Sequence, residues 1–122
     1  MQGKTLTLNL KAKWYNLIES GEKNEEYRLT KEFWVKRLVK SIESYKAQMK
    51  SRESAINDGL DNSDFITEIE SKPFTKIRFV YGYQPNHYME FKFDGLYVGV
   101  GNKEWGAPDF DVFIIKIGER VK

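Results

Sequence analysis

The feature that most constrains the fold is a series of strand-like segments in the second half of the chain. Residues 76–81 and 88–93 alternate apolar with polar side chains, which is the period of a half-buried strand. A third such segment, 96–100, follows Asp94-Gly95, where the chain turns or bulges. The continuous apolar run 112–117 is typical of a strand covered on both faces. We therefore expect a β-sheet to form the core.

The first half of the chain adds one strand and two helices. Leucines alternate with polar residues over 5–10, which predicts another half-buried strand. A short helix over about 12–20 is expected to end at Gly21 in the left-handed cap conformation. A longer helix is predicted from an N-cap at Thr30 through an apolar stripe that ends near Met49.

These elements predict the fold class α+β. We expect a small, partly closed, mostly antiparallel β-barrel of five or six strands with two flanking N-terminal helices. Eleven of the 18 aromatic residues lie from residue 74 onward, within and between the predicted strands, as expected if the sheet provides the core. A chain of 122 residues has the length of one domain, so residues 1–122 are predicted to form a single domain.

An acidic segment at about 51–72 interrupts the regular pattern. Six acidic residues and no basic residue lie from Glu53 to Glu70, with turn-forming residues at 57–59 and 61–63. We expect a mobile surface insertion that takes no part in the barrel core. An acidic loop of this kind could also bind another protein.

The composition excludes several classes of site. The chain has no cysteine and one histidine, which excludes disulfides, thiolate metal sites and multi-histidine metal sites, so we expect no metal and no cofactor. No apolar run approaches the roughly 18 residues of a membrane span. We therefore expect a cytoplasmic protein without a membrane partner, as a monomer or weak dimer.

The densest cluster of functional side chains is the segment Ser20 to Arg28. If its second part is extended, Glu26 and Arg28 share one face with the nearby Lys23, whereas Tyr27 points to the other face. An amine, a carboxylate and a guanidinium at one place can hold a phosphate or polarise a carbonyl group. The alternative is a solvated row of ion pairs worth a fraction of a kcal/mol.

Three residues are considered on aromatic or titratable character alone. Trp105, in the loop GNKEWGAP, could stack on a nucleobase, or it could fold back and plug one end of the barrel. Tyr27 is a weaker stacking candidate, because aromatic residues in strands mostly belong to the core. His87 follows Pro85-Asn86 in a loop, where a lone histidine is usually an exposed bystander.

The segment GEKNEEYR resembles the G-x-K-x-x-E-x-R signature of ASCH domains, small relatives of the PUA domain. The segment also follows a strand and a Trp-bearing helix, as it does in that family, and the resemblance extends to KIRFVYGY, GNKEWGAP and VFIIKIGE. It implies a PUA-like barrel, of a compact single-domain subgroup, with a cleft that handles RNA or a nucleoside. The matching positions are Gly21, Lys23, Glu26 and Arg28.

The resemblance implies two functions for the cleft. The first is binding of RNA or a nucleotide, with Lys23 and Arg28 at a phosphate or base edge, Glu26 orienting them, and Tyr27 or Trp105 stacking. The second is a metal-free amidohydrolase acting on an N-acylated nucleoside such as N4-acetylcytidine, with Lys23 and Glu26 as catalytic residues. A bacterial branch of the family has this activity and a lysine at the position of Lys23, but it has threonines where this chain has Asn24 and Glu26. We therefore expect binding ahead of hydrolysis.

Overall fold

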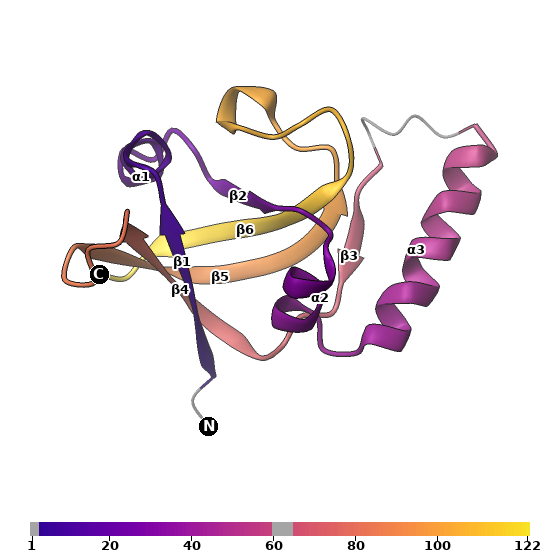
Figure 1. Cartoon of the computed structure of the whole chain (residues 1–122), viewed down its shortest axis with the longest axis horizontal. Coiled ribbons are helices and arrows are strands. Elements are labelled where there is room, and N and C mark those ends of the chain that lie inside the picture. Colours follow the sequence, from indigo (N-terminus) through magenta and orange to yellow (C-terminus); the bar gives the residue numbers. More distant parts are fainter. Residues whose placement is uncertain (1–2, 60–64) are drawn as a thin grey trace.

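The structure is a computed structural model that describes residues 3–59 and 65–122 (Figure 1). Its strands are β1 (Lys4–Leu10), β2 (Glu25–Arg28), β3 (Thr67–Ile69), β4 (Phe74–Tyr81), β5 (Tyr88–Gly99) and β6 (Val112–Arg120). Its helices are α1 (Ala12–Glu19), α2 (Glu32–Leu38), α3 (Ile42–Asn57) and the 3₁₀ turn η1 (Lys103–Trp105). None of these helices is long and apolar enough to cross a membrane.

One mixed sheet runs through the molecule in the strand order β1-β4-β5-β6-β2, with β3 added alongside β5. Only the pair β1–β4 is parallel, and the other pairs are antiparallel. The sheet curls into a half-barrel, in which β1 crosses over β4 and β5 in the view of Figure 1. The expected α+β class with a mostly antiparallel, barrel-like sheet is confirmed. The barrel is open, because β1 and β2 are the two edges of the sheet.

The segments expected at 88–93 and 96–100 form one bent strand, β5. Its first half pairs with β4 and its second half with β3, and β6 follows it with register shifts between Phe91 and Leu96. Asp94-Gly95 is therefore a bulge and not a turn. A bulge bends a strand and increases its twist, and here it curls the sheet.

β6 is buried on both faces, as the apolar run 112–117 predicts. Phe113 and Ile115 lie in the main core, which receives side chains from α1, α2 and α3 and from every strand except β2. Val112 and Ile114 lie on the opposite face in a smaller cluster that includes Tyr27 of β2. This second cluster fixes β2 against the sheet.

The longer helix expected from Thr30 to Met49 is two helices, so the expectation of two helices is wrong. The chain leaves α2 at Val39, whose backbone is extended and forms a β-bridge to Ser71. Helix α3 begins after Ser41, whose side chain accepts a hydrogen bond from the backbone N–H of Ser44 at 3.2 Å. The residue before α2 is Lys31, so the N-cap expected at Thr30 is also wrong. The stripe kept its helical period across the break, which is why periodicity did not reveal it.

The acidic segment is more structured than a surface insertion, and the expectation that it takes no part in the core is wrong. Its first residues continue α3, and the buried guanidinium of Arg52 forms two hydrogen bonds with the carboxylate of Asp111, at 2.8 and 2.9 Å. Ile69 of β3 belongs to the main core. The turn expected at 61–63 lies outside the described residues, and the interpretation as a protein-binding loop depends in part on that turn.

Candidate functional site

The turn between α1 and β2 sets the position of Lys23. Gly21 has a φ of 85°, the left-handed conformation expected for a helix C-cap, and the backbone N–H of Lys23 donates to the carbonyl of Leu17 at 3.0 Å. β2 then begins at Glu25 and pairs with β6. Because the turn is held against α1, the Lys23 side chain is directed inward.

Lys23, Glu26 and Arg28 converge. The Lys23 Nζ lies 2.7 Å from Oε1 of Glu26, and the Arg28 guanidinium forms an ion pair with the other carboxylate oxygen. Lys23 is 2% exposed and Glu26 is 5% exposed. Lys23 and Glu26 are thus a buried pair with the partly exposed Arg28 beside them, and the alternative of a solvated row of ion pairs is wrong for the Lys23–Glu26 pair.

Lys23 has two further partners. Its Nζ donates to the backbone carbonyl of Trp105 at 2.8 Å, which ties the turn to η1. The same Nζ lies 4.4 Å from the centre of the Trp14 ring and 5.5 Å from that of Tyr27. With a carboxylate, a carbonyl and an aromatic face around it, the ammonium group has few hydrogens left to donate to a ligand.

Burial lowers the pKa of Lys23 below its ordinary value, and the positive charge of Arg28 lowers it further. The Glu26 carboxylate opposes both effects by Coulombic attraction and by its hydrogen bond. Burial also raises the pKa of Tyr27. The Tyr27 hydroxyl donates to Glu25 at 2.7 Å and accepts from the backbone N–H of Asn102 at 3.0 Å.

A pocket of about 240 Å³ opens beside this cluster, at the carboxyl end of β1. It is lined by Asn9, Leu10, Lys11, Trp14, Lys23, Glu26, Tyr27, Arg28, Trp105 and Gly106. The loop after η1 lies tight against α1, since a Cβ at Gly106, which has a φ of 96°, would be 2.8 Å from the Trp14 ring. We call this hollow the base pocket.

The base pocket is lined by Lys23, Glu26, Tyr27, Arg28 and Trp105, whereas Gly21, the remaining signature position, is not part of its lining. Tyr27 reaches it with its ring although it also packs in the smaller cluster on β6, and Trp105 is half-buried against that same cluster while one part of it lines the pocket. Trp105 thus packs against the sheet and also lines the pocket, and its stacking on a nucleobase stays a prediction. His87 lies outside the pocket lining and stacks on Tyr81 with ring centres 4.4 Å apart.

Trp14 is the pocket residue that sequence reasoning missed. Its place in the periodic pattern of α1 predicts a buried core residue, whereas the structure leaves it half-exposed at the pocket wall. Its neighbour Tyr15, in contrast, is 2% exposed and lies in the core. An eight-residue helix has too few turns for its pattern to separate these two faces.

Within the described residues there is no group of three or more His, Asp or Glu side chains that could hold a metal ion. The base pocket holds one carboxylate among cations and rings, so its chemistry is hydrogen bonding, stacking and charge. Comparisons of this chain with protein-family models, with curated proteins and with solved structures found no match.

Proposed function

We propose that the chain is a PUA-like ASCH domain that binds RNA or a nucleotide by holding one nucleobase in the base pocket. The observation that carries the proposal is the meeting of Lys23, Glu26 and Arg28 with two tryptophan side chains around one small hollow. The resemblance of GEKNEEYR to the family signature supports it, since the signature positions Lys23, Glu26 and Arg28 line the hollow.

The size of the pocket favours a single ring system. Pockets for drug-sized ligands usually measure about 300–1,000 Å³, and this one, at about 240 Å³, falls below that range. One nucleobase is a planar group of the appropriate scale, and the aromatic side chains of Trp14 and Trp105 are among the lining residues against which it can pack. A whole strand does not fit.

The polar groups fit the edge of a base that has both an amine and a carbonyl group. The Glu26 carboxylate accepts from an exocyclic amine, and Arg28 donates to a ring nitrogen or carbonyl oxygen. Cytosine offers this combination. Lys23 is already bound to Glu26 and to the Trp105 carbonyl, so its role is to hold the carboxylate in place and to balance its charge.

The test is a titration of the protein with cytidine monophosphate, followed by tryptophan fluorescence and by calorimetry. We expect quenching as the base stacks, and a loss of affinity of roughly 5- to 150-fold in Arg28→Ala, because a good bidentate contact to a base contributes roughly 1–3 kcal/mol. Trp14→Ala removes a stacking face from a half-exposed position and should weaken binding without the loss of a buried charge. Glu119→Gln, which removes an exposed charge paired with Lys92 outside the pocket lining, is the control and should bind as wild type does.

If Arg28→Ala and Trp14→Ala bind the nucleotide with the same affinity as wild type, the ligand binds outside the base pocket. Absence of any binding of mononucleotides and of short single-stranded RNA would refute the proposal.

A second function, amide hydrolysis, is favoured by one observation: burial lowers the pKa of Lys23 in the pocket. A neutral amine can act as a general base. Water would add to the acyl carbon of an N-acylated cytidine with its proton passing to Lys23, the bond from that carbon to the exocyclic nitrogen would break, and Lys23 would return the proton to the leaving nitrogen. Arg28 would stabilise the oxyanion.

The two functions separate in one assay. A hydrolase should release cytidine and acetate from N4-acetylcytidine, as followed by chromatography, and this turnover should be lost in Lys23→Met and change little with salt. Phosphate contacts, in contrast, weaken steeply as salt rises. Binding of N4-acetylcytidine without release of acetate would exclude the hydrolase.

A further inference from the structure

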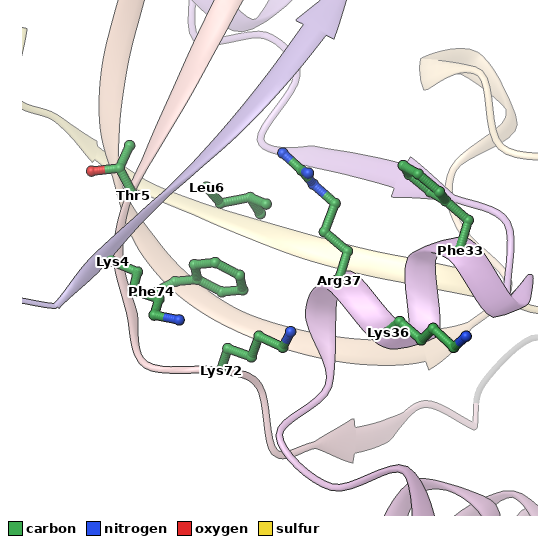
Figure 2. A pocket seen from close by; sticks show the side chains of 8 residues that line it. All are labelled: Lys4, Thr5, Leu6, Phe33, Lys36, Arg37, Lys72 and Phe74. Atoms are coloured by element: carbon green, nitrogen blue, oxygen red, sulfur yellow. The ribbon is translucent and has the colours of Figure 1, made fainter.

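A second hollow lies at the opposite end of β1, where the amino ends of β1 and β4 face α2 (Figure 2). It measures about 490 Å³, about twice the volume of the base pocket. It is lined by Lys4, Thr5, Leu6, Phe33, Lys36, Arg37, Lys72 and Phe74. We call it the basic groove.

The charges that line the basic groove are all positive. Among residues 3–59 and 65–122, four cationic side chains and no acidic one line it. Lys36 forms an ion pair with Glu32 at 2.9 Å, in which both side chains are more than half exposed. Within the residues that the structure describes, neither Lys4 nor Lys72 lies within 4.0 Å of an acidic group. A hollow that is lined only by positive charges raises the local concentration of anions.

Aromatic rings accompany the cations. Phe33 is 63% exposed, which is unusual for so large an apolar side chain, and Phe74 is half-buried in the wall. In Figure 2, Phe33 and Arg37 project from α2, with Lys72 and Phe74 across the groove from them. Cations interleaved with exposed rings are the usual composition of a groove for single-stranded nucleic acid.

Two arginines connect the basic groove with the base pocket along the free edge of β1. Arg37 donates to the carbonyl of Thr7 at 3.1 Å, and Arg28 donates to the carbonyl of Asn9 at 3.3 Å. Both guanidinium groups lie over the ring of Trp34, at 5.2 Å for Arg28 and 5.9 Å for Arg37. The free edge of β1 is thus contacted by arginine side chains between one hollow and the other.

The two hollows are far enough apart for several nucleotides. β1 has seven residues, which at about 3.3 Å per residue is a length of roughly 23 Å. A hollow suits a flexible chain that lies in it, whereas the flat surface of an anionic membrane does not enter a hollow. The function proposed for the base pocket also involves a nucleic acid, so one RNA strand would occupy both hollows.

We propose that the basic groove binds the phosphates of single-stranded RNA, whose strand follows the β1 edge from the base pocket. The course of the strand along β1 rests on the proposed function, because that function places one end of the strand in the base pocket. The basic groove itself is a separate binding site. Lys4, Lys72 and Arg37 contact phosphate oxygens, and Phe33 stacks on a base outside the base pocket. The groove itself is not specific for sequence, because phosphate contacts do not depend on base identity.

The experiment measures the affinity of fluorescein-labelled oligocytidylate of about eight nucleotides and of cytidine monophosphate, by fluorescence anisotropy and calorimetry, at several salt concentrations. The variants are Lys4→Gln with Lys72→Gln, which removes two groove charges, and Phe33→Ala. The control is Lys50→Gln with Lys92→Gln, which removes two exposed charges from outside both hollows. Thermal melts check that each variant is folded.

We expect wild type to bind the oligonucleotide at least about tenfold more tightly than the mononucleotide. The groove variant should lose that advantage, with a salt slope that is shallower by about 0.7 for each lost phosphate contact, and should bind the mononucleotide as wild type does. The control should resemble wild type. Phe33→Ala should weaken binding of the oligonucleotide without changing the salt slope.

The outcomes separate the two proposals. If the groove variant binds the oligonucleotide with unchanged affinity, this inference is wrong and the function proposed for the base pocket is not affected. Groove-dependent oligonucleotide binding with no binding of the mononucleotide, and no effect of Arg28→Ala, overturns the proposed function and keeps the groove as a phosphate site. The assignment to RNA is overturned if the protein binds no oligonucleotide. It is also overturned if anionic phosphatidylserine vesicles bind as tightly as the oligonucleotide and this binding is lost in the groove variant.

Discussion

The base pocket and the basic groove both use lysine and arginine, but in opposite environments. In the base pocket, Lys23 and Glu26 are buried and paired, so their geometry is set by the fold. In the basic groove, Lys4 is exposed and has no acidic partner within the described residues. Buried charges are costly and must be satisfied internally, whereas exposed charges cost little and remain free for a ligand. The same residue types are therefore expected to act structurally and selectively in one hollow and electrostatically in the other.

The largest expected effect comes from breaking the buried pair. Glu26→Ala leaves Lys23 and Arg28 beside each other without their carboxylate, and we expect a loss of about 3–5 kcal/mol in the free energy of unfolding, measured by urea denaturation. Glu119→Ala, in an exposed pair, should change it by less than about 1 kcal/mol. Equal effects in the two variants would mean that burial does not make the Glu26 ion pairs more important for stability than an exposed pair.

The next effect tests how tightly the base pocket is built. Gly106→Ala places a Cβ against the Trp14 ring at a backbone φ of 96°, so strain and a displaced ring should cost roughly 1–3 kcal/mol. The displaced ring should also change the fluorescence of the tryptophans. Gly59→Ala, at a φ of 104° with open space around it, has the backbone strain without the clash and is the control. If both variants lose the same stability, the contact with Trp14 contributes nothing.

The third effect is a pH dependence that only the base pocket should show. The folded-state pKa of Lys23 is lower than its unfolded value, so the unfolded chain binds more protons between those two values. The contribution of Lys23 to stability is therefore present above the unfolded pKa of about 10.4 and is lost as pH falls through the folded-state pKa. Compared with Lys23→Met, wild type should gain stability from neutral pH to about pH 10. A constant difference between the two proteins across this range would contradict the lowered pKa.

The smallest effect on stability belongs to the basic groove. Lys4→Gln with Lys72→Gln should leave the free energy of unfolding within about 0.5 kcal/mol of wild type, since neither ammonium has an acidic partner within the described residues. A loss above about 2 kcal/mol would show that these lysines support the fold, and it would remove the contrast between the hollows.

Much of the candidate site could be predicted locally. The turn at Gly21 and the alternation of β2 place Glu26 and Arg28 on one face, and both are properties of neighbouring residues. The bond from Lys23 to the Trp105 carbonyl could not be predicted in this way, because the two residues are 82 positions apart and meet only in the folded sheet. The basic groove depends on the same long-range placement, with residues from β1, α2 and the segment before β4.

The sequence by itself determined strands β1, β4 and β6, the buried character of β6 and the α+β class, because hydrophobic period and turn chemistry act over a few residues. Only the tertiary structure decided that β5 is one bent strand, that the stripe from Trp34 to Met49 breaks at Val39, and that Ile69 enters the core. It also decided which charges are buried. Burial depends on what covers a side chain from distant parts of the chain, and a local pattern contains no information about that cover.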